Sequence, residues 1–334
     1  MNDTRILLAH GNGGRLMREL IADIFARHLA NPLLDTDADA VTLPPLDGEV
    51  MVTTDGFTVQ PLEFPGGNLG SLAVHGVVND LAVAGADPRY LTLSALIEEG
   101  LEVEVLDRLI ASFATAARES GVAVVAGDTK VVRRGEGGGL YLSVAGIGVK
   151  RAQAPLDIKR IAPGDVVLVS GPVGDHGIAV MLAREQFGLR GDLQSDAASV
   201  LPLTRALLNF SGLRFMRDPT RGGLATVCHE IQRATGLGVH VQQAQIPIRE
   251  PVQSVCDMLG YDPMFLACEG RVVAVVAPEQ AEAAVQALRA QPNGELACVI
   301  GRLEDRAHHV VLHTELGGQR ILEELEDDPL PRIC

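Results

Sequence analysis

Two glycine-rich segments of this chain each stand directly before an expected helix. The first is Gly11-Asn12-Gly13-Gly14, and the second is Arg221-Gly222-Gly223. The unpaired amide groups and the dipole at the start of a helix favour an anion such as a phosphate. The first segment lacks the Gly-Lys-Ser/Thr of a Walker A loop and the spacing of the dinucleotide fingerprint. A phosphate site and a plain glycine-rich turn therefore both remain open for it.

Acidic residues follow expected strands or lie on expected helices at several points. They are Asp37, Asp39, Asp55, Asp80, Asp128 and Asp218. Magnesium prefers oxygen ligands and usually takes one or two carboxylates together with phosphate oxygens. A single aspartate more often caps a helix or closes a turn. Asp80 differs because it lies on the apolar side of its expected helix, where an unpaired carboxylate is costly. A metal ligand and a buried ion-pair partner are the alternatives for it.

Two further charged side chains stand in contexts that suit catalysis. Lys130 ends the segment Gly127-Asp128-Thr129-Lys130, which follows a short apolar run, and it is suited to neutralise a transferring phosphoryl group. An exposed turn is the alternative. Glu269 stands among apolar residues, where desolvation raises a carboxylate pKa and suits a general base. The neighbouring Cys268 is interpreted as a small buried residue rather than as a nucleophile.

The sequence ends in a cysteine, Cys334, after an acidic run at 323–328 and two prolines. Acidic side chains repel one another and prolines oppose a helix, so we expect a mobile tail. A thiol at the end of such a tail can reach the active site of another protein. A prenylation motif is excluded because it needs the cysteine four residues from the end. An incidental terminal cysteine is the alternative.

The elements that must position these residues alternate between strands and helices in both halves of the chain. Helical spacing of apolar residues occurs at 15–29, 69–86, 103–120, 176–188, 196–211, 221–235, 249–260 and 278–290. Strands are expected at 51–54, 122–126, 140–149, 166–169, 238–243, 271–277 and 297–301. Prolines and glycines near 150–164 mark a boundary. We therefore expect two α/β domains, at 1–150 and 151–310, and a tail at 311–334.

Composition excludes several classes of protein. The chain has 334 residues, of which 47% are hydrophobic, enough for packed cores. Its 28 Lys and Arg against 43 Asp and Glu give a net charge of −15, which argues against nucleic-acid binding. No apolar run reaches the roughly 18 residues of a membrane span, and no signal peptide is visible. The five cysteines form no CxxC pair. We expect a cytoplasmic protein that binds neither nucleic acid nor membrane.

Taken together, the motifs resemble those of the HypE family of hydrogenase maturation proteins, in the superfamily of aminoimidazole ribonucleotide synthetase and selenophosphate synthetase. The segments that carry the resemblance are HGNGG (10–14), TTD (53–55), FPGGN (64–68), ND (79–80), GDTKVV (127–132), DPTRGGLA (218–225), CEG (268–270) and PRIC (331–334). Within this superfamily, the terminal segment PRIC is typical of the HypE family. The resemblance implies a two-domain PurM-like α/β (α+β) architecture, each domain a mixed sheet packed with helices, and N-terminal domains that pair in a homodimer.

The resemblance also implies an ATP-dependent reaction on the chain's own tail. A HypF-like carbamoyltransferase places a carbamoyl group on Cys334. ATP with Mg²⁺ then drives dehydration of that thiocarboxamide to a thiocyanate. The cyanide passes to iron on a HypC–HypD complex, for the [NiFe] hydrogenase centre.

The matching motifs give the site residues that the resemblance implies. Cys334 carries the reacting group, Glu269 is the candidate base and Lys130 the candidate γ-phosphate contact. The candidate Mg²⁺ ligands are Asp39, Asp80 and Asp218, with Asp37 as an alternative to Asp39. The candidate nucleotide contacts are Gly11, Gly13, Gly14, Asp55, Asp128, Thr129 and Lys130.

Two other functions stay open. Another ATP-using member of the superfamily, selenophosphate synthetase-like or kinase-like, would act on a small molecule. A selenophosphate synthetase is expected to carry cysteine or selenocysteine near its first glycine segment, whereas the first cysteine here is Cys228. The remaining alternative is an ATP-independent scaffold whose tail docks on a partner. ATP hydrolysis that depends on Cys334 would discriminate among the three.

Overall fold

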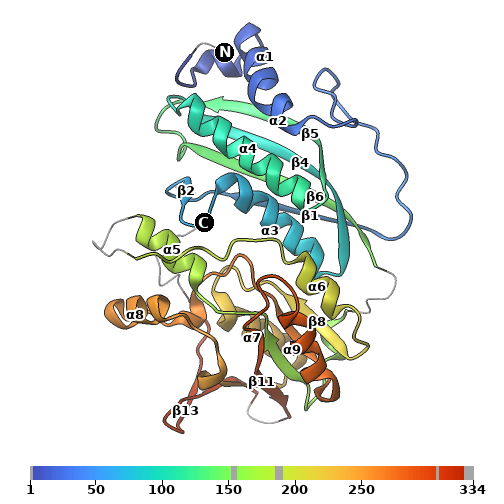
Figure 1. The fold of residues 1–334 in the computed structure, drawn as a ribbon, viewed down its shortest axis with the longest axis vertical. Helices are drawn as coiled ribbons and strands as arrows, with labels where there is room; N and C mark the ends of the chain where they lie inside the picture. The colour runs from blue at the N-terminus through green and yellow to red at the C-terminus, as the bar shows by residue number, and fades with distance from the viewer. Residues whose placement is uncertain (1–2, 152–155, 185–190, 306–307, 327–334) are drawn as a thin grey trace. The chain divides into compact units, whose positions relative to one another are not determined.

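The computed structural model describes residues 3–151, 156–184, 191–305 and 308–326 (Figure 1). The described residues form two compact units. Unit 1 contains residues 3–81 and 86–150, and unit 2 contains residues 82–85 and the described residues from 151 onward. Among the described residues, no helix combines the length and the apolar character needed to cross a membrane.

Unit 1 is built on a four-stranded mixed sheet with the strand order β1-β6-β4-β5. The strands are β1 (Val50–Phe57), β4 (Ala86–Glu98), β5 (Ala123–Val132) and β6 (Leu140–Lys150). β4 and β5 run parallel, whereas β6 is antiparallel to both β4 and β1. β1 and β5 are therefore the two edges of this sheet.

Two helices, α3 (Leu69–Val83) and α4 (Val103–Glu119), cover one face of the unit 1 sheet (Figure 1). The core forms because alternate β4 residues point toward these helices, among them Leu91, Leu93 and Ile97, each at most 2% exposed. The residues between them point to the opposite face and are partly exposed. This alternation leaves that face of the sheet uncovered within unit 1.

A helix at the N-terminus of unit 1 lies beside β5. A short 3-10 turn, η1 (Leu8–Gly11), comes first, and α1 (Arg15–Leu20), the π-helical η2 (Ile21–Ala26) and α2 (Arg27–Leu29) follow without a break. The helix expected at 15–29 is thus confirmed. A small hairpin of β2 (Glu63–Phe64) and β3 (Gly67–Asn68) precedes α3.

Unit 2 is built on a seven-stranded mixed sheet with the order β13-β12-β9-β11-β7-β10-β8. Its strands are β7 (Val166–Val169), β8 (Leu213–Arg217), β9 (Gly238–Gln242), β10 (Val273–Val276), β11 (Cys298–Glu304), β12 (Val310–His313) and β13 (Gln319–Ile321). Only the β9–β12 pair is parallel among these strands.

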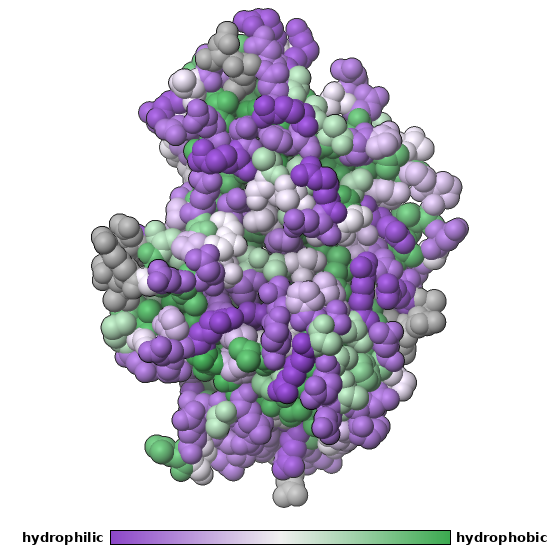
Figure 2. Space-filling model, in the orientation of Figure 1, coloured by the Kyte–Doolittle hydropathy of each residue, from purple (hydrophilic) through white to green (hydrophobic). Residues whose placement is uncertain are grey.

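The helices of unit 2 are α5 (Asp175–Ala183), α6 (Leu201–Leu207), α7 (Gly223–Thr235), α8 (Glu250–Leu259) and α9 (Ala281–Arg289). Of these helices, α7 and α9 contact this sheet, whereas α6 packs against α9, and α8 packs against α5. Short 3-10 turns lie between them: η3 (Ile158–Arg160), η4 (Gln243–Gln245), η5 (Pro263–Phe265) and η6 (Pro278–Gln280). Leu224 and Ile231 of α7 belong to one core cluster with Val239 of β9 and Leu312 of β12. On the face of the molecule drawn in Figure 2, hydrophobic residues occur in small groups among polar ones.

Several strands differ from the sequence-based expectation. β1 continues through Asp55 and Gly56, and β5 continues through 127–130, beyond the strands expected at 51–54 and 122–126. Both segments pair with a neighbouring strand along their length, and an edge strand tolerates polar side chains because one of its sides meets water. Strand β4 was not predicted at all. The helix expected at 196–211 begins only at Leu201.

The expected tail boundary at 311 is also corrected. Apolar residues at Val310 and Leu312 place β12 in the unit 2 sheet, and β13 pairs with it. Leu322, which follows β13, is completely buried. The acidic residues Glu323, Glu324 and Glu326 come after it. Residues 327–334, including Cys334, lie outside the described residues.

Candidate active site

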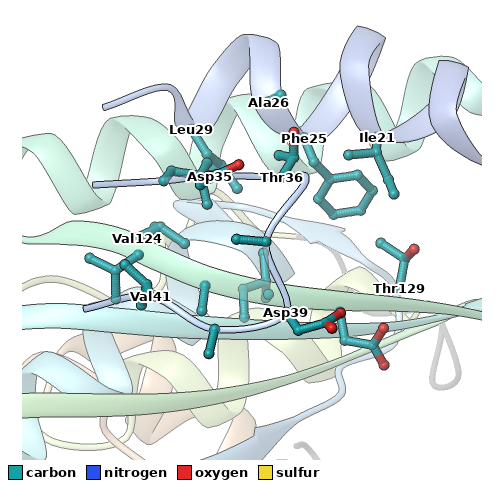
Figure 3. Close-up of a pocket in the computed structure, with 18 of the residues that line it drawn as sticks. Ile21, Phe25, Ala26, Leu29, Asp35, Thr36, Asp39, Val41, Val124 and Thr129 are labelled. Atoms are coloured by element: carbon teal, nitrogen blue, oxygen red, sulfur yellow. The ribbon is translucent and has the colours of Figure 1, made fainter. Parts of the chain in front are cut away.

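A pocket of about 800 Å³, partly open to solvent, lies against the β5 edge of unit 1. Helical residues Ile21, Phe25 and Leu29 form one wall and Val124 of β5 belongs to another, with the loop at 34–41 passing across it (Figure 3). Most of its lining is apolar. Its polar lining residues are Asp35, Thr36, Asp39, Asp128 and Thr129. A concave, largely apolar pocket with a few polar groups is typical of small-molecule sites.

Thr129 brings an unsatisfied hydroxyl to this pocket. Its Oγ1 is buried and has no hydrogen-bond partner in the part of the chain that the structure describes. A buried hydroxyl without a partner costs about 1–3 kcal/mol, so such groups are usually satisfied by a ligand or water. Asp39 and Thr129 lie toward the same end of the pocket (Figure 3). Asp39 lines the pocket and Asp37 does not, so Asp39 is the better placed of these two candidate Mg²⁺ ligands.

The first glycine segment adjoins both β5 and this pocket. A Cβ on Gly11 would lie 2.9 Å from the Cβ of Val131 in β5, so the close approach requires glycine. Gly13 has a φ of +73°, and its N–H donates to Sδ of Met17 at 3.2 Å. Met17 itself lines the pocket. Gly14 is the N-cap of α1, so exposed amide groups at a helix start lie next to the pocket.

The side chains of β5 divide between the two faces of the sheet. Thr129 pairs with the fully buried Ala95 on the face that α3 and α4 cover. Asp128 and Lys130, which pair with Ser94 and Leu96, point to the uncovered face and are exposed. Asp128, at the sheet edge, also lines the pocket.

Asp55 and Asp80 lie at the other edge of the unit 1 sheet. Thr53 of β1 donates a hydrogen bond to Oδ2 of Asp80 at 2.9 Å, and Asp55 is the next residue on the same face of β1. Two strands separate β1 from β5, which amounts to about 14 Å between their backbones. Neither Asp55 nor Asp80 is among the residues that line the pocket at β5. Within the described ranges, no group of three acidic, histidine or cysteine residues could hold a metal ion unaided.

Unit 2 brings two further candidate segments together. Asp218 directly follows β8 and is 7% exposed, and Glu269, before β10, is 6% exposed. The N–H of Cys268 donates to the carbonyl oxygen of Pro219 at 3.0 Å. The two segments expected from the motifs are thus adjacent in this unit.

Cys268 is a buried structural residue, as expected. It is completely buried, and its Sγ accepts a hydrogen bond from the N–H of Gly174 at 3.2 Å. Burial raises the pKa of its thiol well above the usual value, and the nearby Asp196 acts in the same direction. A thiol held neutral in this way is a poor nucleophile.

A buried charge network beside Glu269 was missed by the sequence reasoning. The guanidinium of Arg271 contacts Asp175 at 3.4 Å and Asp196 at 3.3 Å, and Arg249 contacts Asp175 at 2.9 Å. Burial raises the pKa of both aspartates, although Arg271 opposes that shift. The available signal was Arg271 itself, a charge placed two residues before the start of the apolar strand β10.

The two parts of the chain match two family models. AIR synthase related protein, N-terminal domain, matches residues 36–150, and AIR synthase related protein, C-terminal domain, matches residues 162–314. A solved thiamine monophosphate kinase from Aquifex aeolicus, at 18% identity and a TM-score of 0.61, shares the fold. Fold and models together define an AIR synthase related protein.

Closer relatives narrow this class. Carbamoyl dehydratase HypE of Azotobacter vinelandii is 43% identical over 331 residues, which cover 98% of this chain and 96% of the relative. The Escherichia coli K12 protein of the same name is 41% identical over 334 residues, covering 98% of this chain and 99% of the relative. A crystal structure of hydrogenase maturation protein HypE in complex with ATP has a TM-score of 0.93 and 43% identity, covering 98% of this chain and 99% of the other. The chain belongs to the carbamoyl dehydratase HypE family. The family and the two-domain mixed-sheet fold expected from the motifs are confirmed.

Buried His176 of α5 predicts a loss of stability in mild acid. Burial lowers its pKa to about 3, and its Nδ1 lies 2.8 Å from Oγ of Ser195. Below about pH 6.5 the unfolded chain binds a proton on His176 that the folded chain excludes. The free energy of unfolding therefore decreases as the pH is lowered. We expect the wild type to lose about 1–2 kcal/mol more unfolding free energy between pH 7 and 5 than His176→Gln, in urea titrations.

The matched control is His309→Gln, because His309 is exposed. This variant should keep the wild-type dependence on pH. Equal slopes in the wild type and His176→Gln would contradict the assignment.

Proposed function

We propose that this chain is an ATP-dependent dehydratase that converts its own S-carbamoylated Cys334 to a thiocyanate. The product supplies the cyanide ligand for the iron of [NiFe] hydrogenase. The observation that carries the proposal is the similarity, over nearly the full length, to proteins named carbamoyl dehydratase HypE. The terminal cysteine gives the reaction its attachment point.

ATP and Mg²⁺ are proposed to bind at the pocket of unit 1. A solved HypE in complex with ATP supports the nucleotide. The chain fits it, because among the described residues the Thr129 hydroxyl at the pocket has no hydrogen-bond partner, and the segment of Gly13 and Gly14 at the start of α1 lies next to the pocket. Mg²⁺ usually takes one or two protein carboxylates when phosphate oxygens supply the other ligands. Asp39 and Asp128, which line the pocket, could provide these carboxylates.

The remaining candidates complete the proposed assignment. Gly11 holds the glycine segment against β5, and Asp55 is a further contact for the nucleotide or its metal. Asp80 and Asp218 are further candidate Mg²⁺ ligands. Asp80 already accepts a hydrogen bond from Thr53.

Two side chains have separate roles in the proposed dehydration. Bound ATP supplies the phosphoryl group that turns the carbamoyl oxygen into a leaving group. Lys130, exposed on β5, stabilises negative charge at the transferring phosphoryl group. Glu269 accepts the proton from the carbamoyl nitrogen while the C≡N bond forms. Its low exposure excludes water from that step.

A second copy of this chain is the proposed partner of the uncovered face of the unit 1 sheet. Val50 and Val52 of β1 are 50% and 68% exposed on this face, and Ile147 of β6 is partly exposed beside Val52. Apolar side chains on an uncovered sheet face favour burial against another surface. Symmetric homodimers bury the same face of both copies.

Two other partners are proposed. A solved HypE–HypF complex, whose HypE chain is 41% identical with a TM-score of 0.80, supports a HypF-like carbamoyltransferase. A HypC–HypD complex as the acceptor of cyanide rests on the motif resemblance. The small-molecule alternative is less well supported, because the likeness to thiamine monophosphate kinase extends to the fold alone.

Intact-protein mass spectrometry tests the reaction directly. We expect Cys334 to gain one carbamoyl group with the carbamoyltransferase, carbamoyl phosphate and Mg-ATP, and then to lose one water. Without Mg²⁺ in the second step, the adduct should persist, because the phosphates would lack their counter-charge. A Cys334→Ala chain should show neither change. An adduct that forms equally on this control would make the terminal cysteine incidental.

Substitution of the two proposed catalytic side chains tests their roles. Lys130→Ala and Glu269→Gln should each slow dehydration by about 100-fold or more while Cys334 is still carbamoylated. The rate is followed as the conversion of pre-formed carbamoyl adduct. Lys159→Ala and Glu279→Gln, at exposed positions of unit 2, serve as matched controls. A wild-type rate in either catalytic variant would remove that residue from the mechanism.

Sedimentation velocity tests the homodimer. We expect the wild type to sediment as a dimer and Val52→Asp to shift toward monomer, because the substitution places a charge on the apolar face. Leu316→Asp, at a side chain 99% exposed in unit 2, should leave the dimer intact. A monomeric wild type, or an unaffected Val52→Asp dimer, would contradict the proposed interface.

A further inference from the structure

A single buried carboxylate holds the backbone on both sides of Glu269. Oδ1 of Asp196 accepts the N–H of Glu269 at 3.1 Å, and its Oδ2 accepts the N–H of Gly270 at 3.3 Å. The Asp196 side chain is completely buried. Two successive peptide groups are therefore fixed by one side chain, which sets the direction in which the side chain of Glu269 leaves the backbone.

The segment around Asp196 packs directly against Gly270. A Cβ at position 270 would lie 1.9 Å from the backbone oxygen of Asp196 and 3.2 Å from the nitrogen of Ala198, so only glycine fits. The N–H of Ala198 also approaches the carbonyl oxygen of Glu269, at 3.5 Å. Backbone contacts thus reinforce the carboxylate.

Arg271 and Ser195 fix Asp196 in turn. Nε of Arg271 lies 3.3 Å from Oδ2 of Asp196 and donates to the carbonyl oxygen of Pro172 at 2.9 Å. Oγ of Ser195 accepts the N–H of Ala197 at 3.0 Å and lies 2.8 Å from Nδ1 of His176. The carboxylate is therefore held both through its charge and through the segment that bears it.

We infer that Asp196 is a positioning residue for the dehydration: it orients Glu269 by binding the two amide groups beside it. This inference rests on the proposed role of Glu269 as the base. A carboxylate suits the position because it only accepts hydrogen bonds, and both amides and Arg271 are donors. Proton transfer depends steeply on geometry, so a small displacement of Glu269 slows it.

The informative variant is Asp196→Asn, which keeps the shape but replaces one acceptor oxygen with a donor. In the full chain, we expect carbamoylation of Cys334 and ATP affinity to stay at wild-type values. The single-turnover rate of dehydration should fall about 10- to 100-fold. The pH at which that rate reaches half its maximum should also move, because the surroundings of Glu269 change.

A double-mutant cycle separates positioning from a general structural role. Added to Glu269→Gln, the Asp196→Asn change should cause no further loss, because Asp196 acts through Glu269. Asp165→Asn is the matched control, because this buried aspartate likewise binds an arginine, Arg214, at 3.4 Å, and an amide, that of Ala162, at 2.9 Å. This control should dehydrate at the wild-type rate.

The possible negative results separate an error in the role of Asp196 from an error in the proposed function. A wild-type rate and pH profile in Asp196→Asn would overturn the positioning role, as would a full additional loss on top of Glu269→Gln. If Asp196→Asn does not fold, Ser195→Ala is the milder variant, and it should show a smaller loss with the same pH displacement; an unchanged rate would again overturn the inference. A wild-type chain that never loses water would instead overturn the proposed function itself.

Discussion

The parallel pairing of β4 with β5 is the constraint on which the candidate site of unit 1 depends. The register places Thr129 opposite Ala95, so its hydroxyl points to the face that the helices cover. Asp128 and Lys130 consequently point to the other face. A slip of one residue would interchange these side chains and remove Thr129 from its position. The glycine segment depends on the same strand, because Gly11 can approach β5 only where Val131 stands.

Unit 2 meets a different constraint, the burial of charge. Arg271 is 4% exposed, and such a group is tolerated only when its donors find acceptors. It has them in two aspartates and in the carbonyl oxygens of Pro172 and Asn293. Leaving any partner unpaired would cost more than the pair itself contributes. The network therefore rigidifies the segment of residues 269–271, which carries Glu269.

The motifs predicted the family and both glycine segments, and helical periodicity located α3, α4 and α7 closely. Strand β4 was missed although Leu91, Leu93, Ala95 and Ile97 alternate with partly exposed residues, the pattern of a half-buried strand. The segment at 127–130 was expected to follow the strand at 122–126 rather than to continue it. Only its pairing with β4 shows that it is an edge strand.

Other features of the site could not be derived from the sequence. The Thr129 hydroxyl has no hydrogen-bond partner in the described part of the chain, and this depends on what surrounds it in three dimensions. The helix expected at 196–211 starts late because the Asp196 carboxylate binds backbone amides far away in the chain. Local propensity carries no information about such a distant partner.

The burial of Leu322 fixes the point in unit 2 from which the sequence continues to Cys334. Twelve residues follow this fixed point, so the sulfur of Cys334 can travel at most about 40 Å from it. Under the proposed function, a carbamoyltransferase that modifies Cys334 must bring its active site within that distance of Leu322. The same distance limits how far apart the sites can lie at which Cys334 would be carbamoylated and then dehydrated.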